Sequence, residues 1–558
     1  MKQNPLIWIV RKIQKRIPGM VLLTLANIGN ALLGVLFALG SRGVIDSAVS
    51  GNREHFLHAC INQAVIILGI LFCMTLMRHL LERLRADLER DWKQRLLHGL
   101  LHGEYAAVRE YHSAELLNRL NNDVAKVNDG VLNIVPNAAA MVTKVTAAVV
   151  VLGILDLKFT VMMVTIGLVV VAATGIMRKK LKELNKTVST HDGKVSAFLQ
   201  ETIEKLLMVQ AMDISQEVEN RADRLLDARY RIHRKRKNIS LLTNMGVSLF
   251  SYGAGFIALV WSANRLLHGQ ISFGSLTAVI QLVNQIRAPF VNLSGIFPMY
   301  IAMIASAERL MELDAIQGEP GPCCEDPAAL YKTAKGISAQ DLSFSYDRDP
   351  VLTKAAFFLP KGAFAVIAGP SGTGKSTLLK LMLGIFHPEA GQLRLECEES
   401  AILLDRSTRR LFAYVPQGNL LLSGSLRDNL TIVRPDATEE EIRQAVYASN
   451  MEEFLPSLPD GLDTELGESG AGLSEGQAQR LAIARAVLGG APILLLDECT
   501  SALDEETEKT VLQRLKVLPD RTCIAVTHRP AAMALSDWRL ELRDGKIKAI
   551  QKNRERIC

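Results

Sequence analysis

Long stretches without a charged residue are the feature that most limits how this 558-residue chain can fold. Ile17–Gly40, Phe159–Ile176 and Ile239–Asn264 contain no Asp, Glu, Lys or Arg. A helix that crosses a bilayer needs about 17–25 mostly apolar residues, so each stretch is long enough to span. We therefore expect membrane-spanning helices rather than the buried helices of a large soluble protein.

Three weaker apolar stretches complete the set. Ala64–Met77 is short, Val131–Leu155 carries one cation at Lys144, and Ser272–Ala305 carries one at Arg287. A single polar or charged residue is tolerated in a span that packs against other helices. The sequence therefore predicts six membrane-spanning helices.

Charge divides the chain into two parts of opposite sign. Residues 1–315 hold 36 Lys and Arg against 24 Asp and Glu, a net charge of +12, whereas residues 316–558 hold 28 against 34, a net charge of −6. A basic half suits nucleic acid or an anionic membrane surface. Its apolar stretches favour the membrane, and we expect no nucleic-acid partner.

Basic residues cluster in the N-terminal tail, after the fourth expected span and before the fifth. Cytoplasmic loops carry such an excess of Lys and Arg, so we expect a multi-pass protein of the cell (inner) membrane with both termini in the cytoplasm. The first apolar stretch is too long for a signal-peptide core and is interpreted as an uncleaved span. The basic residues are Lys2, Arg11, Lys12, Lys15 and Arg16; Arg178, Lys179, Lys180, Lys182 and Lys186; and Arg231, Arg234, Lys235, Arg236 and Lys237.

Two long polar segments with helical spacing, about Arg78–Asp129 and Arg178–Lys237, connect spans on the cytoplasmic side. A helix rises 1.5 Å per residue, so helical segments of about 25–30 residues within them would project roughly 40 Å beyond the bilayer. Loops near Ser113–Asp123 and Ala211–Val218 are the expected contacts with a domain below the membrane.

The second half has the composition of a soluble α/β domain. A Gly- and Pro-containing stretch opens it, and short β-like runs then alternate with helical ones. No CxxC occurs among the eight cysteines, which gives no support for a zinc or redox site. We expect a membrane domain at 1–315, a linker at 316–335 and an α/β domain at 336–558.

A phosphate-binding loop is the strongest local motif. It follows the strand-like Ala363–Ala368, precedes a helical run, and matches GxxxxGK[ST]. In such loops backbone N–H groups and a helix N-terminus surround phosphate oxygens, the lysine reaches the β- and γ-phosphates, and the serine can hold Mg²⁺. The residues are Gly369, Pro370, Ser371, Gly372, Thr373, Gly374, Lys375, Ser376 and Thr377.

An apolar run ending in two carboxylates, Ile493–Glu498, fits the same chemistry. A buried parallel strand has this composition. Asp497 at its end could bind Mg²⁺, and Glu498 could orient or deprotonate an attacking water. Alone this pattern is weak, but paired with a phosphate-binding loop it predicts nucleotide hydrolysis.

Together these motifs resemble the ATP-binding cassette (ABC) transporters, in particular the exporter type with six spans fused to one cassette. Five further segments carry the resemblance: Gly472–Gln477 looks like the signature motif, Val415–Gln417 the Q-loop, Ser501–Asp504 the D-loop, Thr527–Arg529 the switch-histidine loop, and Ser113–Asp123 the first cytoplasmic loop. Thr464–Glu468 is similar to an exporter loop that senses the membrane domain. The expected fold is an all-α membrane domain followed by an α/β P-loop cassette.

The resemblance implies roles for individual residues. Glu498, His528 and Gln417 would act in hydrolysis, Tyr346 would stack on adenine, and Ser376, Gln417 and Asp497 would hold Mg²⁺. Ser474, Gly476, Gln477 and Asp504 would complete the ATP site. Ser474 and Gln477 also form an ordinary helix-capping pattern. Glu475 departs from the commonest signature, which has glycine there, and we expect its side chain to face away from ATP.

In the family's arrangement ATP lies between the P-loop of one cassette and the signature of another. The chain is therefore expected to be half of a dimer, with a homodimer favoured over a heterodimer. The cargo would be an amphipathic small molecule, peptide or lipid moved out of the cytoplasm. An importer on the exporter fold, with siderophore-like cargo, and a non-transporting ATP-gated membrane protein stay open.

Polar residues in the last two spans could face the cargo path or form hydrogen bonds between helices, and the sequence leaves both open. Lys144 and Arg287 could pair with phospholipid or cargo anions. The polar residues are Asn244, Ser248, Ser251 and Tyr252, and then Gln281, Asn284, Gln285 and Asn292.

Overall fold

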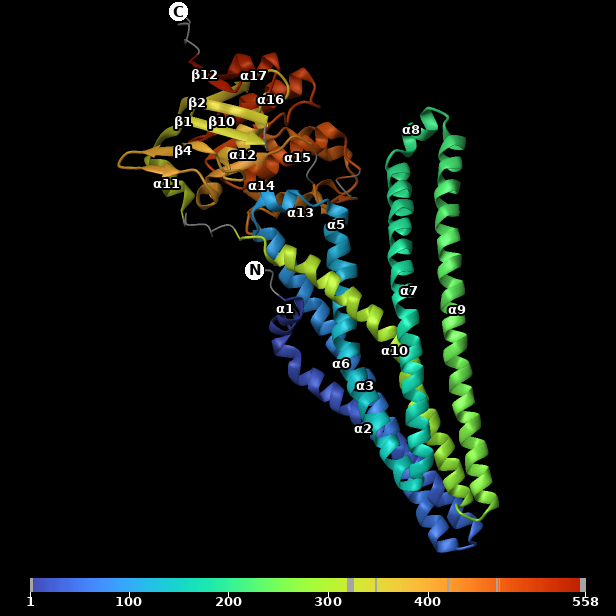
Figure 1. Cartoon of the computed structure of the whole chain (residues 1–558). Helices are drawn as coiled ribbons and strands as arrows, with labels where there is room; N and C mark the ends of the chain where they lie inside the picture. Colours follow the sequence, from blue (N-terminus) through green and yellow to red (C-terminus); the bar gives the residue numbers. More distant parts are fainter. Residues whose placement is uncertain are drawn as a thin grey trace, which may run out of the picture. The chain divides into compact units, whose positions relative to one another are not determined.

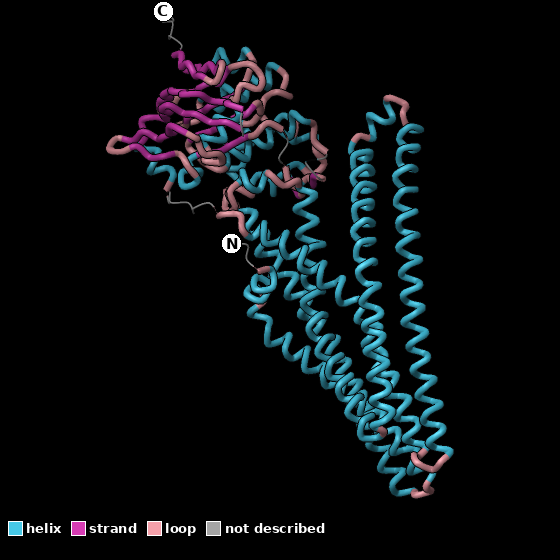
Figure 2. The backbone as a smooth tube through the Cα atoms, in the orientation of Figure 1, coloured by secondary structure: helices cyan, strands magenta, loops and turns pink. Residues whose placement is uncertain are grey.

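The computed structural model of the chain describes residues 4–318, 326–346, 349–418, 421–467, 470 and 472–551. It consists of two compact units. The first comprises Met1–His98 and Ser113–Ala315, and the second comprises Gly99–His112 and Ile316–Cys558. The membrane unit is thus helical and the second unit is an α/β domain, which confirms the predicted fold class (Figure 2).

Each expected span lies within one long helix of the membrane unit (Figure 1). Most of these helices continue well beyond the apolar stretch, as the polar extensions predict. The helices are α2 (Ile17–Val49), α3 (Arg53–His102), α6 (Val124–Leu155), α7 (Leu157–Glu204), α9 (Ser215–Leu267) and α10 (Phe273–Asp314), and α1 (Pro5–Lys12) precedes them.

Hydropathy supports several of these helices as spans. Within the described residues, Gln14–Val49, Arg53–His102 and Ser113–Leu155 are long and apolar enough to cross a membrane. Leu157–Gly167 and Phe273–Ile286 are shorter apolar stretches. The chain therefore has the helices of a membrane-spanning protein.

The ends of α7, α9 and α6 meet around one buried carboxylate. Asp156 is the N-cap of α7 and accepts a hydrogen bond of 3.1 Å from the backbone N–H of Phe159. It also accepts one of 2.9 Å from the indole of Trp261 and pairs with Arg265. A buried carboxylate is stable only when its oxygens are satisfied in this way, so Asp156 fixes the α6–α7 turn against α9.

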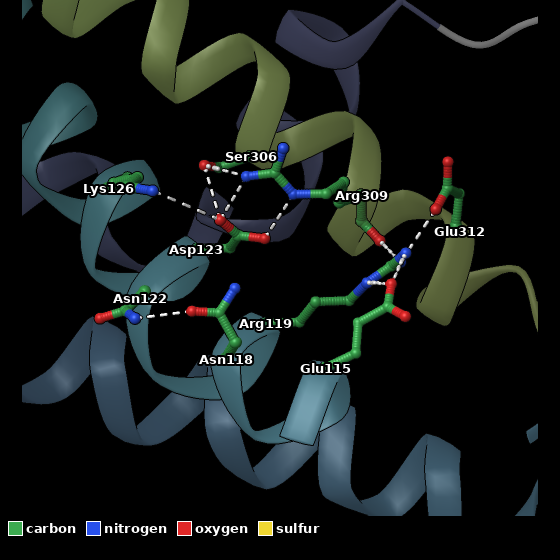
Figure 3. Close-up of polar contacts among 9 residues, drawn as sticks. All are labelled: Glu115, Asn118, Arg119, Asn122, Asp123, Lys126, Ser306, Arg309 and Glu312. Carbon is green, nitrogen blue, oxygen red and sulfur yellow. Dashed lines mark hydrogen bonds and ion pairs between the residues drawn. The ribbon is translucent and has the colours of Figure 1, made fainter. Parts of the chain in front are cut away.

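A second buried carboxylate joins α10 to the start of α6 (Figure 3). The side chain of Asp123 is fully buried and accepts hydrogen bonds of 2.7 and 2.5 Å from Arg309 and of 2.9 Å from Ser306. Burial raises the pKa of Asp123, but the hydrogen bonds from Arg309 and Ser306 and the nearby positive charges outweigh it, so the net pKa is lowered. Asp123 therefore stays ionised at neutral pH.

The neighbouring Arg119 extends this contact into a network. Its side chain is 6% exposed, donates to Glu115 at 2.7 Å and Glu312 at 2.9 Å, and also donates to the backbone oxygen of Arg309 at 2.7 Å. Arg119–Asp123 forms a π-helical turn (η2) between α5 (Ser113–Asn118) and α6. π-Turns are rare and mark places where side-chain geometry overrides regular helix; here both buried side chains come from the turn.

The α/β unit is built on a six-stranded sheet of order β12-β11-β3-β10-β9-β6. All neighbours are parallel except β11 and β12, and β3, β9 and β10 are buried along their whole length. The strands are β3 (Phe364–Ala368), β6 (Phe412–Val415), β9 (Ile493–Asp497), β10 (Thr522–Val526), β11 (Trp538–Arg543) and β12 (Lys546–Gln551).

A four-stranded antiparallel sheet of order β2-β1-β4-β5 makes a second layer of this unit. Gly99–His112, which includes the short helix α4 (Tyr105–Arg109), belongs to the same unit. Arg406 donates to the backbone oxygen of His102 at 3.1 Å, and the Tyr105 ring lies 6.1 Å from the Phe386 ring. Gly99–His112 thus packs within the α/β unit, whereas Ser113–Asp123 belongs to the membrane unit, and the contacts expected of Ser113–Asp123 and Ala211–Val218 stay predictions. The strands are β1 (Ala334–Tyr346), β2 (Asp349–Pro360), β4 (Ala390–Cys397) and β5 (Ala401–Leu403).

Replacing Asp123 with Asn should destabilise the membrane unit. Asp123 is buried but Arg309 is half-exposed, so the main loss is of hydrogen bonds to a charged group, which contribute about 1.5–3 kcal/mol. We therefore expect Asp123→Asn to lower the unfolding temperature of the full chain in detergent micelles. Asp129→Asn is the matched control, because Asp129 pairs with Arg85 at a half-exposed site, where such pairs contribute about 0–1 kcal/mol. Equal unfolding temperatures for the two variants would contradict this role for Asp123.

Candidate functional site

Four predicted motifs meet at one edge of the six-stranded sheet. Val526 lies beside both Ile367 and Asp497 in the strand register, and Val415 lies beside Leu496. Because these strands are parallel, the residues after each one emerge at the same edge. The P-loop, Glu498, the Q-loop and the loop of His528 are therefore brought together.

The P-loop has the backbone that its glycines predict. Gly372 and Gly374 have φ of 80° and 97°, a region that suits glycine. A Cβ on Gly374 would lie 2.2 Å from Val351, and one on Gly369 would lie 2.3 Å from the backbone oxygen of Leu542. The loop then enters α12 (Lys375–Met382) at Lys375. Pro370, Ser371 and Gly372 are exposed, and the hydroxyl of Thr373 donates to Pro370.

Lys375 is held inside this loop. Its side chain is buried, and its Nζ donates to the backbone oxygens of Gly369 at 2.9 Å and Pro370 at 2.8 Å. An ammonium group so placed is a fixed positive charge within a ring of backbone groups. Such a charge suits a phosphate oxygen.

Asp497 lies at the end of β9 and contacts the P-loop. It is 2% exposed and accepts hydrogen bonds of 2.8 Å from Ser376 and 3.0 Å from Tyr414. Burial raises its pKa despite these hydrogen bonds. A nearby divalent cation would stabilise the carboxylate, and the hydroxyl, carboxylate and amide oxygens of Ser376, Asp497 and Gln417 are the ligand type that Mg²⁺ prefers.

Glu498 has an unusual backbone. Its φ of +48° places a non-glycine residue in the left-handed region, and its N–H donates to Val526 at 3.0 Å. Strain of this kind persists where the surrounding structure imposes it and is found most often at functional sites. Gln417 donates to the Glu498 carboxylate at 2.8 Å, so two predicted residues from different strands are in contact.

His528 follows β10 at the same edge but is not drawn into these contacts. Its side chain is exposed, and within the described residues no hydrogen bond or ion pair involves it. The neighbouring Thr527 is buried and accepts a hydrogen bond of 3.1 Å from the N–H of Arg529. The imidazole is therefore presented to solvent by a fixed loop.

The signature motif opens helix α15 (Glu475–Leu488). Ser474 is the N-cap of this helix. The backbone N–H of Gln477 donates to the Ser474 hydroxyl at 3.3 Å, and the backbone N–H of Ser474 donates to the Gln477 side-chain oxygen at 2.9 Å. Ser474 and Glu475 are exposed. In the described part of the chain, no hydrogen bond links Ser474, Gly476 or Gln477 to the P-loop, which fits an arrangement with the signature serving another cassette.

A set of contacts that the sequence did not reveal holds the D-loop. Gln479 donates to the Ser501 hydroxyl at 3.0 Å and accepts from the Ala502 N–H at 3.1 Å. Arg529 donates to the backbone oxygens of Ser501 and Leu503. A Cβ on Gly476 would lie 3.0 Å from the backbone oxygen of Ala502. The signature helix, the D-loop and the loop of His528 are thus joined within one cassette.

The end of the D-loop begins helix α16 (Glu505–Lys516). Asp504 is its N-cap and accepts from the N–H of Thr507 at 2.9 Å. The buried Glu508 accepts from Thr500 at 2.8 Å and pairs with Arg529 at 3.3 Å. The Asp504 residue itself is exposed.

Tyr346, the predicted adenine platform, lies in an aromatic cluster. Its ring is perpendicular to those of Phe344 and Phe386, and its hydroxyl is 3.2 Å from that of Thr377. The guanidinium of Arg109 in α4 lies over the ring, 5.6 Å from its centre. This cation–π contact connects the first cytoplasmic loop to the side chain expected to bind the base.

Comparisons with known proteins agree with the geometry. The family profile described as "ABC transporter transmembrane region" matches residues 20–290, and that described as "ABC transporter" matches residues 352–501. A solved structure of a bacterial Atm1-family ABC exporter with ATP bound has a TM-score of 0.78, covering 97% of this chain and 95% of its own. At 23% identity this similarity concerns the fold alone.

Three curated relatives are similar in sequence. The ATP-dependent lipid A-core flippase of Chromobacterium violaceum is 31% identical, over 78% of this chain and 75% of its own. The mycobactin import ATP-binding/permease protein IrtB of Mycolicibacterium smegmatis is 34% identical, over 68% and 66%. ABC transporter B family member 1 of Dictyostelium discoideum is 27% identical over 83% of this chain, which spans only 51% of that relative.

Replacing Gln479 with Ala should loosen the D-loop. The Ala502 N–H and the Ser501 hydroxyl would lose their partner, and each such loss costs about 1 kcal/mol. We expect amide hydrogen exchange at residues 500–504 to accelerate about fivefold or more, because exchange reports local opening. Gln513→Ala removes an exposed amide from α16 and should leave exchange in these residues unchanged; an equal effect of both variants would argue against the contact.

Proposed function

The chain belongs to the ABC transporter family, and we propose that it is an ATP-hydrolysing half-transporter that works as a dimer. It carries one membrane region and one cassette, the half-transporter architecture. The observation that carries the proposal is the meeting of the P-loop, Asp497 and the strained Glu498 at one sheet edge. In this proposal residues 1–315 are the membrane domain, 316–335 the linker and 336–558 the cassette.

The P-loop would bind the phosphates of ATP. Its backbone N–H groups and the N-terminus of α12 face the phosphates, and the Lys375 ammonium exchanges its two loop carbonyls for phosphate oxygens. Tyr346 stacks on adenine through the ring face not covered by Arg109. Gly369 to Thr377 act together as the phosphate cradle, since the tight turns at Gly372 and Gly374 set its shape.

Ser376, Gln417 and Asp497 would hold Mg²⁺. The ion, when bound, neutralises charge that develops on the phosphate oxygens. The contact of Ser376 with Asp497 at 2.8 Å supports this set, because it already places a hydroxyl and a carboxylate side by side. Tyr414 orients the carboxylate from the other side.

Glu498 would orient the attacking water and accept its proton. Gln417 holds the carboxylate at 2.8 Å, and the positive φ aims the side chain away from the direction it would take in an extended strand. His528, exposed at the same edge, would contact the γ-phosphate. Both groups are present, so each site of a homodimer would be competent.

A second copy would complete each site. Ser474 and Asp504 are exposed and Gly476 and Gln477 are partly exposed, and all four would face the P-loop of the partner. The short helix α8 (Leu206–Ala211), between α7 and α9, gives a second argument. Its Leu207 is 81% exposed, and Met212 beside it is 65% exposed, so a partner surface would cover an apolar tip on the cytoplasmic side.

We propose export as the direction of transport, with an amphipathic cargo. Relatives named for a flippase and for translocation of α-hemolysin support export, whereas the relative named for mycobactin import supports the second candidate, uptake. Accumulation of labelled amphiphiles in vesicles of known sidedness separates them. The positive-inside pattern supports cytoplasmic termini and an inner-membrane location.

Among the polar residues of the last two spans, some form hydrogen bonds between helices and others are candidates to contact cargo. Gln285 donates to the Gly34 backbone oxygen at 2.6 Å, which is a hydrogen bond between helices. Asn284, Ser248 and Tyr252 are exposed and remain candidates to face cargo. The side chains of Asn244, Ser251, Arg287 and Asn292 lie outside the described residues.

Replacing Glu498 with Gln should leave the affinity for ATP within a few fold of the wild-type value. It should reduce the turnover number of ATP hydrolysis by about 10²- to 10⁴-fold, the usual contribution of a general base. ATP binding and phosphate release by the full chain in nanodiscs check this. Glu506→Gln, at an exposed site in α16, should hydrolyse ATP normally. Wild-type turnover in Glu498→Gln would remove Glu498 from the proposed mechanism.

Replacing Lys375 with Ala should weaken ATP binding itself. Losing a charge-assisted hydrogen bond lowers affinity about tenfold or more, which equilibrium binding of a labelled ATP analogue measures. Lys509→Ala, an exposed lysine of α16, should bind normally. Unchanged nucleotide affinity in Lys375→Ala would overturn the proposed phosphate site.

A further inference from the structure

The membrane layer of this chain has an unbalanced charge. Across the six apolar stretches there are two cations, Lys144 and Arg287, and no Asp or Glu. A charge near the bilayer centre is costly unless it is paired, and intramembrane charges almost always have a partner. The spans themselves offer no acidic side chain, so the partner must come from outside this chain's spans.

Lys144 lies deep in the layer. It is eleven residues before the outer end of α6 at Leu155, or about 17 Å along the helix. The apolar core of a bilayer is about 30 Å thick. Lys144 is therefore close to the middle of the membrane, too far from either surface for its side chain to leave the apolar core easily.

The lysine points into the helix bundle rather than toward the exposed side of α6. Exposed residues recur at Val142, Thr146 and Val150, and the period of 3.6 residues places Lys144 opposite the first two. Ala148, one turn further, is fully buried in a cluster with Leu282 and Val283 of α10. The Lys144 side chain itself is only partly exposed.

The part of the chain that the structure describes offers this ammonium no partner. Among the described residues, Lys144 takes part in no hydrogen bond or ion pair. An ammonium carries three donors and no acceptor. A lone cation that faces packed helices in a membrane is a functional-site candidate rather than a stabilising feature.

Unsatisfied acceptors lie at a similar depth on α10. The buried side-chain oxygens of Gln281 and Gln285 have no hydrogen-bond partner, although the Gln285 amide nitrogen is used by Gly34. Gln281 and Gln285 follow the outer end of α10 at Phe273 by eight and twelve residues, or about 12 and 18 Å. This brackets the depth of Lys144 on the antiparallel neighbour α6.

From this arrangement we propose that the α6–α10 seam binds the phosphate group of an amphiphile at mid-membrane depth. Lys144 pairs with phosphate oxygens, and the amide oxygen of Gln281 accepts from a P–OH or a headgroup hydroxyl, whereas the Gln285 amide is held against Gly34 of α2. The apolar chain of the ligand stays among the apolar side chains around them. The inference rests on the proposed function and names the chemical class of its cargo.

The test compares probes that share one alkyl chain. Wild-type protein in phosphatidylcholine nanodiscs is titrated with dodecyl phosphate, dodecanol, dodecyltrimethylammonium and inorganic phosphate, and binding is measured by native mass spectrometry alongside ATP hydrolysis. We expect dodecyl phosphate to bind about tenfold or more tightly than dodecanol, the difference that one charged hydrogen bond supplies. Inorganic phosphate alone should bind weakly, since it lacks the chain.

Variants locate the site. Lys144→Gln should abolish the preference for dodecyl phosphate over dodecanol, and Lys144→Arg should retain it. Lys158→Gln, an exposed lysine at the outer end of α7, should change neither. An unchanged preference in Lys144→Gln, equal binding of dodecyl phosphate and dodecanol to the wild type, or equal binding of inorganic phosphate would overturn the proposal.

Binding is measured without hydrolysis, so the two proposals can fail separately. A wild type that binds dodecyl phosphate selectively but never hydrolyses ATP would refute the transporter function and keep the site. A wild type that hydrolyses ATP but shows no preference among the probes would refute the site alone. If Lys144→Gln does not fold, the preference of the wild type and of Lys144→Arg for dodecyl phosphate over dodecanol still tests the proposed site.

Discussion

Hydrocarbon cannot hydrogen-bond, and the architecture of the membrane unit depends on that constraint. Every backbone N–H and C=O in the bilayer must find a partner within the protein, which leaves helices as the solution for a chain of this composition. Because the helices are continuous, they carry their geometry out of the membrane in α3, α7, α9 and α10. The polar parts of these helices therefore continue the same helices that cross the apolar layer.

Where these helices leave the apolar layer, hydrogen bonds to buried carboxylates hold neighbouring helices together. Asp156 fastens the turn between α6 and α7 to α9, and Asp123 fastens the start of α6 to α10. The donors to Asp156 lie on α7 and α9 and those to Asp123 lie on α10, so each carboxylate fixes a relative position that apolar contacts alone would leave free to slide. The π-turn at Arg119–Asp123 is the local cost of bringing both side chains to the same buried place.

The sequence predicted the membrane helices and the nucleotide motifs because both are local signals. Apolar length identifies a span, and glycine spacing identifies a phosphate loop without any knowledge of distant residues. The partners of Gln479, Arg529 and Asp123 could not be predicted, since a glutamine or an arginine in sequence gives no sign of which loop it will touch. The same limit explains why the sequence did not show that Gly99–His112 belongs to the α/β unit, since only tertiary packing reveals this.

The contact of Arg109 with Tyr346 has a consequence in terms of linkage. If adenine binding to the Tyr346 ring strengthens or weakens the contact with Arg109, then displacement of α4 must change the affinity for adenine by the same factor, because the coupling free energy between two sites is reciprocal. Anything that shifts the end of α3 would then be registered as a change in nucleotide affinity. In that case the Tyr346 ring would link adenine binding to the position of α4.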